Sequence, residues 1–140
     1  MLKGISKLIS PKLLKVLMEM GHGDEIVFGD SNFPAASHAK ILIRSDGHSI
    51  TDMLDAILPL FPLDYAVEYS GILMDCGKST GVPVWSRYKE KLSLYPDGNK
   101  NLLTIPKSEF YERAKKAYCV VATSECESFA NLIIRKGVIR

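Results

Sequence analysis

Residues 21–30 read Gly-His-Gly-Asp-Glu-Ile-Val-Phe-Gly-Asp, and they place a histidine and an acid at the two ends of one short apolar run. The run itself, residues 26–28, is partly β-branched and is bounded by Gly29, which is typical of a buried strand. Asp30 follows the carboxyl end of that strand, where open α/β sheets bind their ligands. We therefore expect a strand here, flanked by side chains suited to chemistry.

A helix is predicted immediately before His22. Ser10 suits the N-cap, Pro11 suits the first helical position, and Gly21 can end the helix. Apolar residues between them recur at helical spacing, namely Leu13, Leu14, Leu17 and Met20. His22 is thus expected to leave the end of a helix and to precede the strand.

The remaining chain alternates short apolar runs with amphipathic segments. Further strands are predicted at residues 41–43, 67–74, 102–105, 118–122 and 132–134. Further helices are predicted from Ser49, which forms a capping-box pattern with Asp52, from Val84 to Leu92, and from Ser108 as a cap. No linker, repeat or low-complexity tract interrupts this alternation, which predicts one layered α/β domain over residues 1–140 with a mostly parallel or mixed, largely buried sheet.

Charge and hydropathy exclude several classes of partner. The chain has 18 basic and 16 acidic residues and a net charge of +2, which gives no electrostatic footprint for nucleic acid or an anionic membrane. Its longest apolar stretch, residues 56–63, is too short and too interrupted by proline to span a bilayer, and no signal-peptide core follows the amino terminus. Three unevenly spaced cysteines, Cys76, Cys119 and Cys126, indicate neither a disulfide framework nor a zinc knuckle. We expect a soluble, cytoplasmic protein with reduced thiols.

Residue types alone leave ordinary structural interpretations open. A histidine after a helix is often a solvated or capping group, and Asp30-Ser31-Asn32 is compatible with simple turn chemistry. His22, Asp24, Asp30 and His38 together suggest a metal site, but no H-x-x-x-H or other dense ligand spacing supports it, so no metal or cofactor is expected. His38 and His48 are interpreted as ordinary loop residues.

The polar connection at residues 123–131 ends in an aromatic residue and an amide. It is interpreted either as a surface loop whose Phe129 docks on the core or as a sugar-binding loop. In the second case the ring would face sugar C–H groups and Asn131 would bind hydroxyls. The loop alone does not decide between the two.

Several motifs together resemble the ribose pyranase and fucose mutarotase family (RbsD/FucU). They are residues 19–26 (Glu-Met-Gly-His-Gly-Asp-Glu-Ile), residues 33–35 (Phe-Pro-Ala), residues 110–113 (Phe-Tyr-Glu-Arg) and Ala130-Asn131 followed by residues 133–138. The opening is closest to the fucose mutarotase branch, and the likeness runs from Met1 to Arg140. It implies a three-layer, RbsD-like α/β/α domain in a ring-like homo-oligomer, with a decameric ring as one candidate assembly and the sugar site near a subunit contact. The apolar segment at residues 58–63 looks exposed and would suit such a contact.

The resemblance also implies roles for individual residues. The histidine at the position of His22 is the family's proton donor, and the acid at the position of Asp30 binds the sugar. Further sugar contacts are implied at Lys107 and at the tripeptide Phe129, Ala130 and Asn131. This chain departs twice from the family pattern, because the fucose branch has arginine at Lys107 and the tripeptide normally begins with tyrosine where Phe129 stands. Lysine keeps the charge but loses the planar fork, and phenylalanine lacks the hydroxyl.

The activity implied is mutarotation of a free aldose, L-fucose or a similar sugar, by general acid/base ring opening, with pyranose–furanose exchange left open. Histidine suits this chemistry because its unperturbed pKa near 6.5 leaves both protonation forms available near neutrality. Asp30 either orients His22 or binds sugar hydroxyls through hydrogen bonds, and the resemblance favours the second role. The alternative is a non-catalytic monosaccharide-binding protein associated with sugar transport, in which Phe129 marks the loss of a proton-transfer partner.

Overall fold

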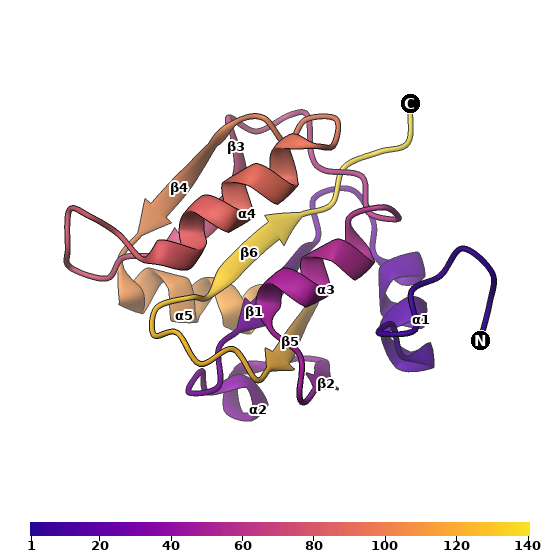
Figure 1. The fold of residues 1–140 in the computed structure, drawn as a ribbon, viewed down its shortest axis with the longest axis horizontal. Helices are drawn as coiled ribbons and strands as arrows, with labels where there is room; N and C mark the ends of the chain where they lie inside the picture. Colours follow the sequence, from indigo (N-terminus) through magenta and orange to yellow (C-terminus); the bar gives the residue numbers. More distant parts are fainter.

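A computed structural model describes all residues from 1 to 140 and contains one six-stranded sheet (Figure 1). The strands are β1 (Glu25–Gly29), β2 (Leu42–Ser45), β3 (Tyr69–Met74), β4 (Asn101–Ile105), β5 (Cys119–Thr123) and β6 (Leu132–Arg135). The helices are α1 (Pro11–Glu19), α2 (Ala35–His38), α3 (Ile50–Ile57), α4 (Pro83–Ser93) and α5 (Lys107–Lys116).

The sheet is mixed, as the sequence predicts. Its strand order is β2-β5-β1-β6-β3-β4, in which β1 pairs parallel with β5, β5 with β2, and β3 with β4. Strand β6 lies between β1 and β3 and runs antiparallel to both. Five strands therefore end on one side of the molecule, the carboxyl end of the sheet, where β6 begins. On the opposite side, the amino end of the sheet, those five strands begin and β6 ends.

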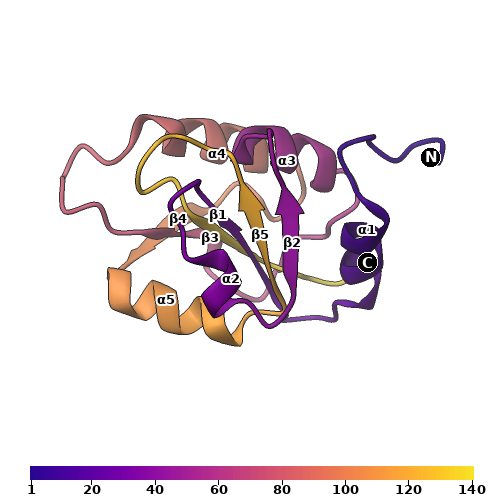
Figure 2. The same cartoon turned by 90° about the horizontal axis from the view of Figure 1, so that it is seen from below.

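Helices cover both faces of the sheet, which confirms the three-layer α/β/α architecture (Figure 2). Helices α3 and α4 lie over one face, and α2 and α5 lie over the other. Successive side chains of β1 point to opposite faces of the sheet. Ile26 and Phe28 join one apolar cluster, and Val27 joins the second. Burial on both faces explains why the strands read as continuous apolar runs rather than as alternating ones.

Local signals at two helix starts are confirmed. The Ser10 hydroxyl accepts the Leu13 N–H at 3.1 Å, and Pro11 occupies the first turn of α1. At α3, Ser49 and Asp52 form both hydrogen bonds of a capping box. Helix α1 ends at Glu19, because Met20 is already extended, so Gly21 is not its terminator.

The cap predicted at Ser108 is wrong. Helix α5 begins at Lys107, one residue earlier, with Pro106 at the N-cap position and no side-chain cap. Proline fixes φ near the helical value and needs no N–H partner at a helix start, so a serine cap is not required. The short helix α2 was not predicted either, and it places His38 at a helix end rather than in a loop.

The segment at residues 58–63 is mostly buried in the chain's own core, contrary to its exposed appearance in the sequence. Leu58, Phe61 and Leu63 are only 2–4% exposed and pack into the same apolar cluster as α3. Leu60 remains 38% exposed. No helix in the fold combines the length and apolar character needed to cross a membrane.

Candidate functional site

A polar pocket of about 190 Å³ lies at the carboxyl end of the sheet. It is formed where several strands end and β6 begins, the position at which open α/β sheets bind ligands. Its lining brings together four of the residues singled out in the sequence, Asp30, Lys107, Phe129 and Asn131, with Asn32, Phe33, Met74, Tyr111 and Ser128. A larger groove of about 520 Å³ by residues 58–63 is mainly apolar, and its two charged residues, Asp97 and Arg140, pair with each other.

Asp30 is held rigidly in this pocket. It is only 6% exposed, its Oδ1 accepts the Asn32 N–H at 3.0 Å, and its own N–H donates to Asn131 Oδ1 at 2.8 Å. Burial raises the pKa of the Asp30 carboxyl and outweighs the backbone hydrogen bonds from Asn32, Ala130 and Phe33 that lower it. A buried carboxylate of this kind is stabilised by any further hydrogen-bond donor that enters the pocket.

Helix α4 fixes the loop that carries the aromatic residue and the amide. The Trp85 Nε1–H donates to Phe129 O at 2.9 Å, and the Tyr88 hydroxyl donates to Ala130 O at 2.8 Å. Phe129 has a φ of 58°, a left-handed conformation that bulky residues rarely adopt. The Phe129 ring packs against the core, as expected for a surface loop that docks there. It also lines the pocket, which is the position that a ligand-binding loop requires.

Lys107 and Tyr111 form the opposite wall, one turn apart on α5. The Lys107 ammonium lies 5.7 Å from the centre of the Tyr111 ring, which also contacts the rings of Phe33 and His38. Tyr111 was not predicted as a site residue, although its (i, i+4) spacing from Lys107 places both on one helix face. It brings a phenolic hydroxyl to a pocket whose Phe129 has none.

A glycine allows this wall to form. A Cβ at Gly29 would lie 2.8 Å from side-chain atoms of Phe33, closer than packed carbon atoms approach. The absence of a side chain at Gly29 therefore lets the Phe33 ring sit against the end of β1, directly beside Asp30.

His22 lies outside this pocket, at the amino end of the sheet. It precedes β1 whereas Asp30 follows it, and the five residues of β1 separate the two by roughly 16 Å at the usual rise of a strand. One monosaccharide ring does not bridge that distance. Within a single chain Asp30 therefore does not orient His22.

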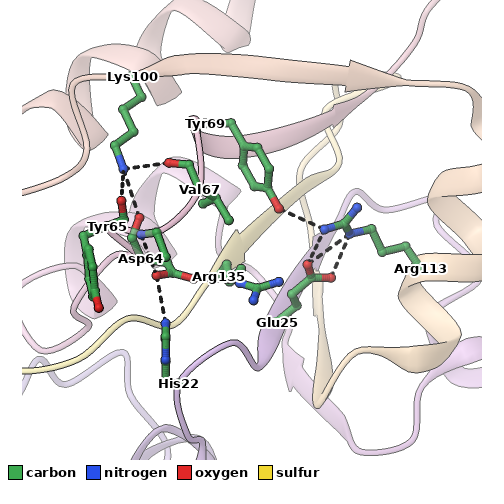
Figure 3. A network of polar contacts seen from close by, with 10 residues as sticks. His22, Glu25, Asp64, Tyr65, Val67, Tyr69, Lys100, Arg113 and Arg135 are labelled. Carbon is green, nitrogen blue, oxygen red and sulfur yellow. Dashed lines mark hydrogen bonds and ion pairs between the residues drawn. The ribbon is translucent and has the colours of Figure 1, made fainter.

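Asp64 orients the imidazole instead (Figure 3). His22 Nε2 lies 3.0 Å from Asp64 Oδ1, which also accepts the Ala66 N–H at 3.0 Å, and Arg135 Nε donates to Asp64 Oδ2 at 2.7 Å. Burial alone would raise the pKa of the Asp64 carboxyl, but the hydrogen bonds from Ala66, His22 and Arg135 outweigh it and lower the pKa.

The ionised form of Asp64 fixes the tautomer of His22. An ionised carboxylate only accepts hydrogen bonds, so His22 Nε2 carries the hydrogen and Nδ1 is the atom left for a ligand. The His22 side chain is 43% exposed, which leaves that atom accessible. Neither Asp64 nor Arg135 carries a sequence signal, because only the placement of β6 beside β1 and β3 brings them to His22.

The glycine after His22 has a conformational role. Gly23 has a φ of +89°, and a Cβ there would also lie 3.1 Å from Arg135 Nη2. Any larger residue would strain the turn and press on the guanidinium that holds Asp64. The side chains considered as metal ligands are dispersed, with His22 and Asp30 at opposite ends of the sheet, and no three His, Cys, Asp or Glu side chains gather as a metal site.

The whole chain is related to proteins of known structure. Residues 3–139 match the RbsD / FucU transport protein family. The chain belongs to the RbsD/FucU family. Fucose mutarotase of Mus musculus is 47% identical over 146 aligned residues, which cover 99% of this chain and 95% of that protein.

Solved structures of this family superpose closely. The crystal structure of the fucose mutarotase of Streptococcus pneumoniae in complex with L-fucose is 45% identical, with a TM-score of 0.90 over 99% of this chain and 100% of that chain. FucU of Bifidobacterium longum is also 45% identical, with a TM-score of 0.92 over the same shares. Bacillus subtilis RbsD complexed with D-ribose, at 21% identity, a TM-score of 0.74 and full coverage of both chains, shares the fold.

Proposed function

We propose that this RbsD/FucU-family chain is a mutarotase that interconverts the α and β anomers of a free aldose, L-fucose or a similar sugar. The observation that carries the proposal is full-length relatedness to fucose mutarotases, at 47% and 45% identity, in a chain with a polar pocket at the carboxyl end of its sheet. The Streptococcus pneumoniae relative was crystallised with L-fucose, which supports this substrate class.

The reaction is the reversible opening of a cyclic hemiacetal. In its imidazolium form, with Nε2–H on Asp64, His22 donates the Nδ1 proton to the ring oxygen as the bond from that oxygen to the anomeric carbon breaks. A water molecule takes the proton of the anomeric hydroxyl as its oxygen becomes the aldehyde oxygen, and ring closure returns a proton to Nδ1. Rotation about the adjacent C–C bond and closure by the reverse steps give either anomer. Asp64 fixes the imidazole through Nε2, so Nδ1 performs the transfer. A proton transfer from a positioned group typically contributes ~10²–10⁴-fold.

The sugar itself is bound in the pocket. Asp30 accepts hydrogen bonds from sugar hydroxyls, and Lys107 and Asn131 donate hydrogen bonds to sugar oxygens. Phe129 presents its ring to the apolar face of the sugar. Ala130 is fully buried and does not line the pocket, so it takes part only through its backbone, whose carbonyl oxygen accepts the Tyr88 hydroxyl. The buried position of Asp30 and the rigid attachment of the loop to α4 support these roles.

His22 reaches the sugar from a second copy of the chain. The amino end of one sheet, with His22, faces the pocket at the carboxyl end of another sheet, so one site is shared by two subunits. A contact between two different surfaces is heterologous, and when its rotation closes it forms a ring. This supports the ring-like homo-oligomer, and a decamer would contain ten such sites. We place the protein in the cytoplasm, which its three free cysteines favour.

Exchange NMR tests the proposed activity. We expect the wild-type protein to accelerate α/β exchange of L-fucose, with D-ribose and D-galactose as comparison sugars, equally with and without a chelator. His22→Ala should remove most of the acceleration. It should leave the fold intact and lower the unfolding temperature only modestly, because the side chain is half-exposed and the buried Asp64 carboxylate keeps its hydrogen bonds from Ala66 and Arg135. Binding of sugar without exchange in the wild type would instead favour the non-catalytic binding protein, and full exchange by His22→Ala would exclude His22 as the proton donor.

A further inference from the structure

Lys100 makes an unusual set of contacts at the amino end of the sheet. It precedes β4, and its ammonium donates to three backbone carbonyl oxygens, Asp64 O at 3.1 Å, Tyr65 O at 3.2 Å and Val67 O at 2.8 Å (Figure 3). An ammonium group has three N–H donors and no acceptor, so these contacts use all of them. Lys100 therefore has no donor left for a ligand, and its role must be exercised through the loop that it binds.

That loop, residues 64–67, carries the groups that hold His22. The Asp64 carboxylate accepts from His22 Nε2, and the Ala66 N–H holds the same carboxylate oxygen. The Tyr65 ring lies nearly parallel to the imidazole, at 9° with 6.1 Å between ring centres. Lys100 thus binds the backbone of the loop whose Asp64 and Tyr65 side chains contact the imidazole.

The position of Lys100 is fixed in turn by the sheet. The hydroxyl of the buried Ser70, in β3, donates to Lys100 O at 3.0 Å, and the next residue begins β4, which pairs with β3. Arg135, at the end of β6, holds the Asp64 carboxylate from the other side at 2.7 Å. The loop is therefore fixed to the sheet at two points, through the Asp64 side chain by Arg135 and through its backbone by Lys100.

We propose that Lys100 is a positioning residue for His22, which sets the direction of Nδ1 by holding the loop at residues 64–67. The inference rests on the proposed function for its catalytic consequence, but the effect on the imidazole does not depend on catalysis. A displacement of a reacting group by about 1 Å can reduce a rate by about a hundredfold, so a loosened loop has a large effect on proton transfer. Sugar binding occurs in the pocket at the other end of the sheet and is not altered.

The test compares Lys100→Met with Lys91→Met as a matched control. Lys91 is also largely buried and also makes two short contacts, with Asp55 Oδ1 and Oδ2 at 2.7 and 2.8 Å, but it joins α3 to α4 away from His22. The first readout is the ring ¹⁵N NMR spectrum, in which the three histidines are few enough to assign His22 by its loss in His22→Gln. The second readout is kcat and KM for anomer exchange.

We expect Lys100→Met to shift the His22 ring nitrogens from the Nε2–H tautomer toward a mixture and to lower kcat by about ten- to a hundredfold with KM unchanged. Lys91→Met should leave both readouts at wild-type values. Lys100→Arg retains the charge and N–H donors but presents them in a planar fork, so it should recover only part of kcat. Unchanged His22 signals and unchanged kcat in Lys100→Met would overturn the inference while leaving the proposed function intact. A shifted His22 signal in a protein whose wild type exchanges no sugar would support the positioning role and overturn the proposed function.

Discussion

Phe129 stands where the family resemblance implies a tyrosine. The backbone of Phe129 has a left-handed conformation, and its carbonyl oxygen accepts a hydrogen bond from Trp85. The fold therefore fixes the backbone from which the ring enters the pocket. A sugar hydroxyl that a tyrosine would meet there must find another partner. Tyr111 offers a phenolic hydroxyl on the opposite wall.

We expect Phe129→Tyr to accelerate pyranose–furanose exchange of at least one aldose by up to about tenfold, and to change simple mutarotation less. The added hydroxyl can position a hydroxyl further along the sugar chain for closure of the smaller ring. Both exchanges are measured in one NMR spectrum, with Phe129→Leu as the control that keeps an apolar wall. Equal rates for Phe129→Tyr and the wild type on every sugar would show that residue 129 acts only as an apolar wall.

The binding role proposed for Asp30 comes with a cost to stability. Because folding raises the pKa of the Asp30 carboxyl, the folded chain holds this proton up to a higher pH than the unfolded chain does. Its contribution to the free energy of unfolding is thus fully present below the unfolded pKa of about 3.9 and is lost as the pH rises through the folded pKa.

We expect Asp30→Asn to unfold at a higher temperature than the wild type at pH 7, with the difference disappearing below about pH 4. The amide keeps an oxygen for the Asn32 N–H but loses the charged acceptor, so KM should rise at least about tenfold while kcat falls less. Thermal unfolding across pH and exchange kinetics measure the two effects. A variant that is less stable than the wild type at pH 7 would show that the carboxylate is better satisfied than its burial indicates.

At the scale of elements, local sequence signals correctly predicted one strand and the starts of two helices. The strand at residues 26–28, the N-cap at Ser10 and the capping box at Ser49 depend on neighbours within a few positions, and all three are confirmed. Ser108 has equally suitable chemistry but lies inside α5, because the proline before Lys107 already starts the helix.

This contrast gives a paired prediction. Ser49→Ala should lower the free energy of unfolding by about 1 kcal/mol, because it removes the side-chain acceptor of the Asp52 N–H. Ser108→Ala should change it by less than about 0.5 kcal/mol, as for a surface substitution without a special role. Both variants should retain wild-type exchange activity, as urea denaturation and NMR would record. A large loss in Ser108→Ala would contradict the assigned start of α5.

The candidate site could be predicted only in part, for a topological reason. Residue patterns place Asp30 after a strand, and the family resemblance adds Lys107 and the tripeptide, which the structure brings into one pocket with the exception of the small Ala130. The partners of His22 could not be predicted, because Asp64 and Arg135 are 71 positions apart and meet only through the antiparallel insertion of β6. The contacts of Lys100 were inaccessible for the same reason, since they follow from the pairing of β3 with β4.

At the scale of the whole molecule, the two groups of candidate site residues lie at opposite ends of one sheet. The carboxyl end holds the pocket. The amino end holds the imidazole with its ion-paired support (Figure 3). In the proposed mechanism, His22 of one chain meets the pocket of a second chain only across a contact between the two chains. A single chain then contributes a half-site to each of two neighbours, which makes assembly a condition for catalysis.

Co-expression of His22→Ala and Asp30→Ala chains carrying different tags tests this claim most directly. Each variant alone should be nearly inactive, because one lacks the proton donor and the other lacks the main sugar-binding group. In a mixed ring with equal numbers of both chains, about one quarter of the contacts join an intact His22 to an intact pocket, so about one quarter of wild-type exchange should return. Mixed assemblies, isolated through both tags, that are no more active than the separate variants would contradict a site shared between copies.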